Sequence, residues 1–300
     1  MKMKSKNKKQ FTKRSKDQNF IVKENSELLS FLLAKITNLS RNSIKNLLKN
    51  RQIAVNGVPT TQFNFTLVKE DLVTVLSEKS FLKAKMNLPI IYEDDDFIVI
   101  DKPHDLLSVP SDDLKKTNVY QILSNYVQQD NKRKRIYIVH RLDEGTSGVM
   151  LVAKNEKIRN LLQKNWNEYV IKRQYIAVVE GRVLKKEETL KHFLAENQFN
   201  LMYVTKNPKA GKQCITKYKV LQSNESFSML EVEILSGRKN QIRVQLGYIG
   251  HFVLGDDKYG HPPNPYKRLA LHASELSFFH PLKKKMMSFK SPIPKQFKII

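Results

Sequence analysis

From residue 88 onward the chain is divided into short apolar runs, which are rich in β-branched residues and separated by polar turns. Such runs predict strands, here over residues 90–92, 97–100, 136–139, 149–153, 175–180, 215–221, 228–235, 241–246 and 269–276. Helical patterns are confined to residues 119–128 and to a segment that Asn155 caps and that ends near Trp166. Because strands outnumber helices and do not alternate strictly with them, residues 88–300 predict an α+β fold. We expect a large mixed, mainly antiparallel sheet flanked by helices.

The residues before this domain have a different composition. Residues 1–18 form a lysine-rich tail without an apolar period, which predicts disorder and either nonspecific attraction to phosphate or a solubilising role. Residues 19–78 predict a small α/β module, and residues 79–87 predict a linker. The sequence therefore indicates two domains joined by a basic segment.

Two helices and a hairpin are predicted within the module. Ser26 is expected to cap a helix over residues 27–35, and Ser40 to cap a second helix whose apolar stripe is Ile44, Leu47 and Leu48. On another face of this second helix a basic residue recurs every four positions, at Arg41, Lys45 and Lys49. The pair Asn56-Gly57 predicts a tight hairpin turn, and residues 72–76 a further strand.

The segments LSRNSIKNLLKNRQIAVNGVPT and VKEDLVTV resemble the RNA-binding motif of the ribosomal-protein S-four type. The resemblance implies that the face carrying Arg41, Lys45 and Lys49 docks on an RNA backbone while the small sheet holds the helix rigid. Without the resemblance, a basic helix face is most often only a solvated face.

Charge and cysteine content narrow the function classes. Lysine plus arginine exceed aspartate plus glutamate by 53 − 29 = 24, which indicates a polyanionic partner. Nucleic acid is the favoured partner, and an anionic membrane surface is the alternative. The single cysteine, Cys214, excludes a disulfide framework and a multi-cysteine zinc site and favours the cytoplasm. There is no signal peptide or apolar span, no nucleotide-binding glycine motif, no HExxH, no GxSxG and no metal-ligand spacing of histidines. We therefore expect no cofactor, no metal and no membrane association.

The few glycines concentrate in two windows. The first is HRLDEGTSG, residues 140–148, in which a strand leads in, another leads out and Asp143 stands in a polar turn close to Arg141. The second spans residues 237–260. Loops on a rigid scaffold commonly present reactive groups, although an Asp-Glu-Gly turn taken alone is ordinary.

The string HRLDEGTSG resembles the HRLDxxTSG signature of the RluA/RluD-type pseudouridine synthases. Further segments resemble other motifs of that family: DKPHDLLSVP, KRQYIAVVEG, SGRKNQIRVQLGYIGHFVLGDDKYG and RLALHASELSFFHP. The resemblance implies isomerisation of uridine in RNA without a cofactor. It implies that Asp143 is the catalytic carboxylate, that Tyr175 contacts the base and that Arg243, or less well Arg238, pairs with Asp143. It also implies RNA contacts for His140, Arg141 and Arg238.

Asn240 and Gln245 stand where the third family motif usually has histidines, which puts the substrate contacts of that segment in doubt. On a strand over residues 241–246, Arg243 would face opposite to Ile242 and Val244 and could point into a polar cleft. Instead of pairing with Asp143, Arg243 could be an exposed residue that contacts a phosphate. Instead of contacting the base, Tyr175 could be an aromatic residue of the core.

The resulting hypothesis is a monomeric cytoplasmic RNA pseudouridine synthase. Large-subunit ribosomal RNA is the leading substrate and transfer RNA the second. Two alternatives stay open from the sequence: a non-catalytic RNA-binding or ribosome-assembly factor on the same fold, and a DNA-binding or membrane-surface protein driven by charge alone.

Overall fold

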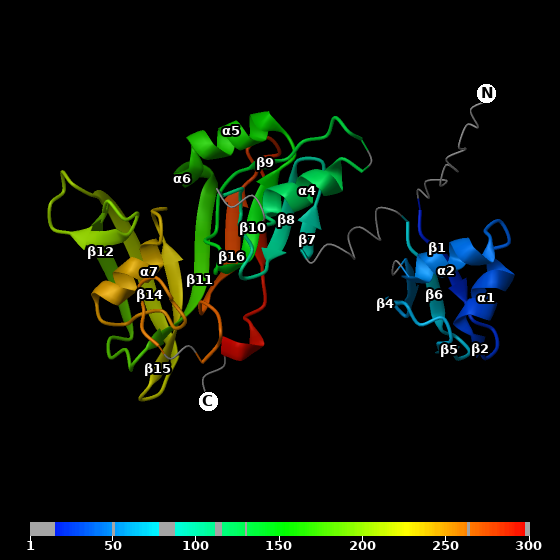
Figure 1. Cartoon of the computed structure of the whole chain (residues 1–300). Helices are drawn as coiled ribbons and strands as arrows, with labels where there is room; N and C mark the ends of the chain where they lie inside the picture. Colours follow the sequence, from blue (N-terminus) through cyan, green and yellow to red (C-terminus); the bar gives the residue numbers. More distant parts are fainter. Residues whose placement is uncertain are drawn as a thin grey trace, which may run out of the picture. The chain divides into compact units, whose positions relative to one another are not determined.

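The chain divides into two compact units, residues 1–87 and residues 88–300, in a computed structural model (Figure 1). The structure describes residues 16–49, 52–77, 88–111, 116–129, 131–262 and 265–297. The predicted linker and the predicted basic tail up to residue 15 lie outside the described residues. The last residue of that tail, Gln18, already belongs to strand β1.

The first unit is a four-stranded antiparallel sheet that shares one apolar core with two helices. The strand order is β1–β6–β3–β4, and a two-stranded pair of β2 and β5 lies beside it. The elements are β1 (Gln18–Ile21), β2 (Ser26–Glu27), α1 (Leu28–Lys35), α2 (Arg41–Lys49), β3 (Ile53–Val55), β4 (Val58–Thr60), β5 (Thr66–Leu67) and β6 (Leu72–Val75).

The two helix starts of this unit differ from each other. Ser40 caps α2 as predicted, since its Oγ accepts the N–H of Ser43 at 3.2 Å. Ser26 does not cap α1, because it lies in β2 and pairs with Leu67 of β5. Helix α1 therefore begins after Glu27 and has no side-chain cap. The prediction for Ser26 was wrong because a cap pattern is local, whereas a strand pair depends on a distant segment.

The predicted hairpin turn is confirmed between β3 and β4. Asn56 and Gly57 both have positive φ, 49° and 80°, as a two-residue turn of this kind requires. The Asn56 side chain also donates to Asp71 at 2.8 Å and accepts the N–H of Leu72 at 2.9 Å, which ties the turn to the start of β6. The basic residues of α2, Arg41, Lys45 and Lys49, are exposed.

The second unit is built on one large sheet, which confirms the predicted α+β fold with a mixed, mainly antiparallel sheet. The strand order is β13–β12–β14–β15–β11–β16–β10–β8–β7, with β17 beside β16 and β9 beside β10. The strands are β7 (Ile90–Glu93), β8 (Phe97–Lys102), β9 (Tyr137–Ile138), β10 (Ser147–Ala153), β11 (Val170–Glu180), β12 (Glu187–Glu196), β13 (Met202–Thr205), β14 (Lys212–Ser223), β15 (Phe227–Ile234), β16 (Leu271–Phe279) and β17 (Met286–Lys290). Among these pairs only β10 with β16 is parallel.

Helices pack at both ends of this sheet (Figure 1). They are α4 (Val119–Val127), α5 (Glu156–Lys164), α6 (Trp166–Tyr169) and α7 (Gln241–Tyr248), followed near the C-terminus by a 3₁₀ turn (Lys295–Phe297). Asn155 caps α5 as predicted, its Oδ1 accepting the N–H of Ile158 at 2.9 Å. In the part of the chain that the structure describes, no helix is long and apolar enough to cross a bilayer.

Residues 241–246, predicted as a strand, form the first part of helix α7. Ile242 and Leu246, four residues apart, belong to the main core, while Val244 packs on another cluster with Cys214. The polar residues between them are buried as well: Gln241, Arg243 and Gln245. The alternation of apolar and polar residues was misleading here because the polar side chains bond inside the protein instead of facing water.

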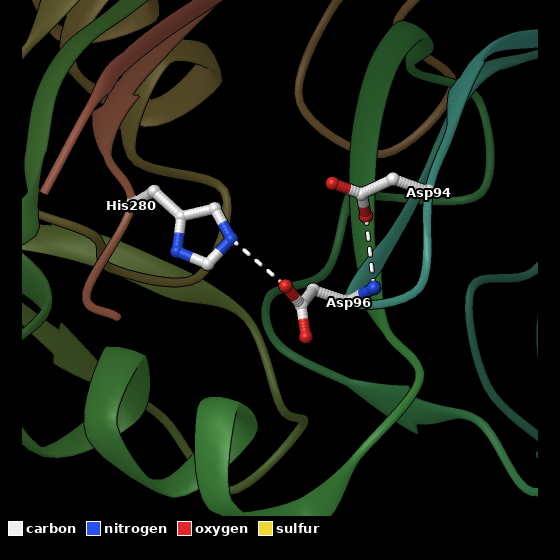
Figure 2. Close-up of side chains that lie close together, drawn as sticks. All are labelled: Asp94, Asp96 and His280. Carbon is white, nitrogen blue, oxygen red and sulfur yellow. Dashed lines mark hydrogen bonds and ion pairs between the residues drawn. The ribbon is translucent and has the colours of Figure 1, made fainter. Parts of the chain in front are cut away.

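A polar clasp joins the β7–β8 turn to the end of β16. Figure 2 shows Asp94, Asp96 and His280: Asp94 accepts the N–H of Asp96 at 2.8 Å, and Asp96 lies 3.2 Å from Nε2 of His280. Nδ1 of His280 accepts the backbone N–H of Lys283 at 3.2 Å, so Nε2 carries the ring proton and donates it to Asp96. The Lys283 ammonium lies 3.0 Å from Asp94 and 2.9 Å from Asp96. Because that ammonium already pairs with both carboxylates, the cluster acts as a structural clasp.

The parallel pair of β10 and β16 holds the start of β10 very close to the neighbouring backbone. Gly148, at φ 109°, pairs with Ala273, and a Cβ at Gly148 would lie 2.1 Å from the carbonyl oxygen of Ala273. Only glycine fits such an approach together with that φ. The position therefore fixes where the loop before β10 ends.

We expect Gly148→Ala to lower the free energy of unfolding by more than about 3 kcal/mol, because it combines backbone strain with a clash against a backbone oxygen. Gly250→Ala is the matched control. Gly250 also has positive φ, 86°, but a Cβ there meets nothing within 4 Å, so only about 1–2 kcal/mol of strain is expected. Urea unfolding measures both, and equal losses would contradict the close-approach argument.

Candidate active site

The two glycine windows meet in one cleft of the second unit, with a volume of about 490 Å³. The loop before β10, strand β11 and the segment leading into α7 line this cleft. Six of the predicted site residues lie in it: His140, Arg141, Asp143, Tyr175, Arg238 and Arg243. The other three, Arg41, Lys45 and Lys49, belong to α2 of the first unit. The structure thus brings together the residues of the second unit that the sequence selected.

A second, smaller cleft of about 280 Å³ also borders Asp143. Its lining includes Arg141, Lys239 and Lys258 together with residues 107–111. Asp143 therefore stands between two hollows, one of which contains Tyr175 while the other is lined by lysines. Its side chain is 36% exposed, enough for a ligand to reach it.

Ser108 holds the backbone immediately before Asp143. The buried Ser108 hydroxyl donates to the carbonyl of Leu142 at 2.6 Å and accepts the N–H of Leu142 at 3.1 Å. On the other side of Asp143, its carbonyl accepts the N–H of Thr146 at 3.1 Å, which closes the turn. The carboxylate is thus presented from a backbone that is bonded on both sides.

Lys102, at the end of β8, also fixes this loop through hydrogen bonds. It is completely buried, and its ammonium donates to the carbonyls of Pro103 at 3.0 Å, Leu106 at 2.6 Å and Glu144 at 3.0 Å. Burial lowers the pKa of Lys102 from 10.5 to about 8, and the attraction of Asp143 offsets that effect only in part. The sequence suggests no role for Lys102 within DKPHDLLSVP, because no local pattern shows that its ammonium would reach Glu144.

Arg243 reaches the cleft from helix α7. Nη1 lies 3.4 Å from Oδ2 of Asp143, so the predicted pair forms, but as a long contact. The tighter partner is Asp256, which binds Nη2 at 2.6 Å and Nε at 2.7 Å. Burial tends to lower the pKa of Arg243, but the hydrogen bonds and charge of Asp256, with a smaller contribution from Asp143, raise it overall. Arg243 therefore remains a fixed cation beside Asp143.

Asp256 is a second residue that sequence reasoning missed. Its side chain is 1% exposed, and Oδ1 also accepts the N–H groups of Lys258 and Tyr259, both at 3.0 Å. A carboxylate inside the segment GDDKYG has the appearance of a turn residue. The only available signal was its place in the second glycine window, since nothing in that segment distinguishes Asp256 from the exposed Asp257.

The side chains of Asn240 and Gln245 both form hydrogen bonds inside the protein. Asn240, with φ 53° just before α7, accepts from Nη1 of Arg243 at 3.2 Å and donates to the Tyr259 hydroxyl at 2.9 Å. The Gln245 side chain accepts from Thr216 at 2.7 Å and donates to the carbonyl of Leu190 at 3.3 Å. Asn240 thus helps to orient Arg243, and Gln245 anchors α7 on the sheet behind it.

Tyr175 lies on β11, between β15 and β16, and its side chain enters the cleft. Burial raises the pKa of Tyr175 to about 12, against the opposing influence of Arg173 and with a contribution from Asp143. The phenol is therefore protonated at neutral pH. It offers the cleft an aromatic face and a hydroxyl near the carboxylate.

His140 lies in the cleft as a neutral ring. Nε2 accepts the N–H of Leu151 at 3.0 Å, and burial, with the charge of Arg173, lowers the pKa of His140 to about 4. Its ring leans against Trp166 at a centroid distance of 5.3 Å. His140 therefore contributes no positive charge for a phosphate at neutral pH, whereas Arg141, exposed at the border of both clefts, does.

Comparison with known proteins identifies the family. Residues 96–248, which include Asp143, Tyr175 and Arg243, match the model of the RNA pseudouridylate synthases. The chain belongs to this family. An uncharacterized RNA pseudouridine synthase of Mycoplasma genitalium is 33% identical over 290 residues, covering 93% of this chain and 92% of the relative. Ribosomal large subunit pseudouridine synthase D of Haemophilus influenzae is 33% identical over 242 residues, covering 76% and 74%.

Solved structures share the fold. The human RNA pseudouridylate synthase domain containing 4 matches with a TM-score of 0.59 and 21% identity, covering 73% of this chain and 93% of that chain.

Membership of the pseudouridine synthase family makes the protein an isomerase that converts uridine to pseudouridine in RNA. The family therefore favours the enzymatic hypothesis over a non-catalytic RNA-binding factor.

We expect Asp256→Asn to lower the free energy of unfolding by about 3 kcal/mol, because it leaves the buried Arg243 guanidinium without its main counter-ion. Asp257→Asn is the matched control and should change stability by less than about 0.5 kcal/mol, since Asp257 is exposed. Urea unfolding at neutral pH measures both. Similar values for the two variants would show that the Arg243–Asp256 pair does not stabilise the site.

The lowered pKa of Lys102 makes a pH-dependent prediction. Between about pH 8 and pH 10.5 the unfolded chain binds a proton on Lys102 that the folded chain has released, so stability should rise with pH in this window. We expect the free energy of unfolding of the wild type, minus that of Lys102→Met, to increase by up to about 3 kcal/mol across it. Subtracting the variant cancels all other titrating groups, and a difference that stays flat or falls with pH would refute the prediction.

Proposed function

We propose that Asp143 is the catalytic carboxylate of this enzyme, acting on a uridine that is turned out of its RNA into the cleft. One observation carries the proposal: among the described residues that line the cleft, Asp143 is the only carboxylate. It shares the cleft with an aromatic side chain, Tyr175, and lies beside a fixed cation, Arg243.

The reaction needs few chemical groups. The bond between N1 of uracil and C1′ of ribose breaks, the base turns, and a bond from C5 to C1′ replaces it. C5 loses its proton and N1 takes one up, so the product is an isomer of the substrate. One carboxylate can begin this sequence, as a nucleophile or as a base. The guanidinium of Arg243, which Asp256 holds in place, lies beside Asp143 and supplies a positive charge next to the carboxylate. The long 3.4 Å contact leaves most of the carboxylate's hydrogen-bonding capacity to the substrate.

We assign Tyr175 to the flipped base. A protonated phenol on a rigid strand can stack on uracil, and its hydroxyl can approach the carbon that loses its proton. Arg141, exposed at the edge of both clefts, is suited to fill the gap left by the everted nucleotide or to bind a phosphate. Arg238, whose Nε donates to the carbonyl of Gln213 at 3.4 Å, adds positive charge to the rim.

We propose large-subunit ribosomal RNA as the substrate, with transfer RNA as the second candidate, and a monomer in the cytoplasm as the working form. The name of the Haemophilus influenzae relative supports the ribosomal choice. The first unit supports it too: its exposed basic residues Arg41, Lys45 and Lys49 lie on a capped helix over a small sheet, as in an RNA-binding module of the S-four type.

Asp143→Asn should abolish pseudouridine formation and the release of tritium from RNA labelled at C5 of uracil, because an amide can act neither as a nucleophile nor as a base here. RNA binding should persist. The matched control is Glu144→Gln, a neighbouring carboxylate that forms an exposed ion pair with Lys116 and should keep most of the activity.

The substrate is found by mapping pseudouridine in ribosomal and transfer RNA from cells with and without the gene. Sites that disappear on deletion and return with the wild type, but not with Asp143→Asn, support the proposal. Restoration of a site by Asp143→Asn would remove Asp143 from the mechanism.

A further inference from the structure

Arg173 is a cation in the active-site cleft that the roles above do not use. It lies on β11 two residues before Tyr175, and both side chains line the cleft. Its guanidinium carbon lies 6.0 Å from the centre of the Trp166 ring. A Cβ at Gly237 would lie only 3.1 Å from Nη1 of Arg173, so the absence of a side chain at Gly237 leaves room for the guanidinium.

The other cations of the cleft have protein partners for their charge or are well exposed. Arg243 binds Asp256 and Asp143, Lys239 pairs with Glu196, and Arg141 and Arg238 are exposed. Arg173 is partly buried, and among the described residues no carboxylate forms an ion pair with it. Burial lowers the pKa of Arg173, and the electrostatic influence of Tyr175 and then of Glu233 offsets this only in part. A partly buried cation without a counter-ion costs stability in the free protein.

We propose that Arg173 binds a backbone phosphate of the everted nucleotide, so that Trp166, Gly237 and Arg173 form a phosphate site beside the base site at Tyr175. Uracil is neutral and would leave the charge of Arg173 uncompensated, whereas a phosphate of the same nucleotide supplies a full anion. Alternate residues of a strand stand about 7 Å apart on one face, so one nucleotide can contact both side chains. The proposal rests on the proposed function in taking the cleft as the site of the target nucleotide.

The test uses Trp166, the single tryptophan of the chain. The full-length protein is titrated with a seven-residue oligouridylate while Trp166 fluorescence is recorded. Binding should saturate, and Arg173→Gln should weaken it about tenfold. The slope of log Kd against log salt should fall by about 0.7, because the variant neutralises one phosphate fewer than the wild type does. Arg173→Lys keeps the charge and should keep that slope.

Arg182→Gln is the matched control, because Arg182 pairs with the exposed Glu225 and does not line the cleft. A slope and affinity for Arg173→Gln equal to those of Arg182→Gln would overturn the proposal. The melting temperature of Arg173→Gln distinguishes a role in binding from a role in stability. If Arg173 serves binding, removing a cation that has no counter-ion should leave the melting temperature unchanged or raise it. A clear fall would assign Arg173 a structural role instead.

The titration requires no catalysis, so its result is independent of the catalytic assignment. If Arg173 proves essential for oligouridylate binding while Asp143→Asn still forms pseudouridine, the phosphate site stands and the role of Asp143 falls. If Asp143→Asn is inactive but Arg173→Gln binds as the wild type does, the catalytic assignment stands and the phosphate site is refuted.

Discussion

The site depends on how one buried guanidinium divides its hydrogen bonds between two carboxylates. Arg243 gives its short bonds, 2.6 and 2.7 Å, to Asp256 and a long one, 3.4 Å, to Asp143. The buried carboxylate thus fixes the cation, and the cation in turn lies beside the accessible carboxylate without occupying it. A single ion pair between Arg243 and Asp143 would have satisfied both groups and left less capacity for a substrate.

Contacts from other parts of the chain also fix the backbone around Asp143. Ser108 bonds both polar groups of Leu142, Lys102 binds the carbonyl of Glu144, and Gly148 brings β10 against β16. These contacts involve two segments that are distant from the loop along the chain, residues 102–108 and strand β16. They place the carboxylate before any ligand arrives, which reduces the ordering that a substrate would otherwise have to impose.

Local patterns carried most of the fold. The apolar runs marked many of the strands, although β12, β13 and β17 were not predicted. Asn155 and Ser40 marked helix starts and Asn56-Gly57 marked a turn, because each is decided by nearby residues. The HRLD loop and the segment around Tyr175 were found by resemblance, and they do share a cleft.

The failures concern distant partners. Ser26 is paired by Leu67, forty residues and more along the chain, and α7 was mistaken for a strand because its polar residues are buried against the sheet. Arg243 was expected in the cleft and lies there, but it projects from a helix. Asp256 and Lys102 could not be selected from the sequence, because their partners, Arg243 and the carbonyl of Glu144, come near them only in the folded protein.

The parallel contact of β10 with β16 has a consequence for the timing of synthesis. Ser147 and Gly148 meet His272 and Ala273, and Ser147 is separated from its hydrogen-bond partner His272 by 125 residues. During translation the HRLD loop leaves the ribosome long before the strand against which it rests. A nascent chain therefore carries every group of the first glycine window before strand β16, on which the end of that window rests, has been made.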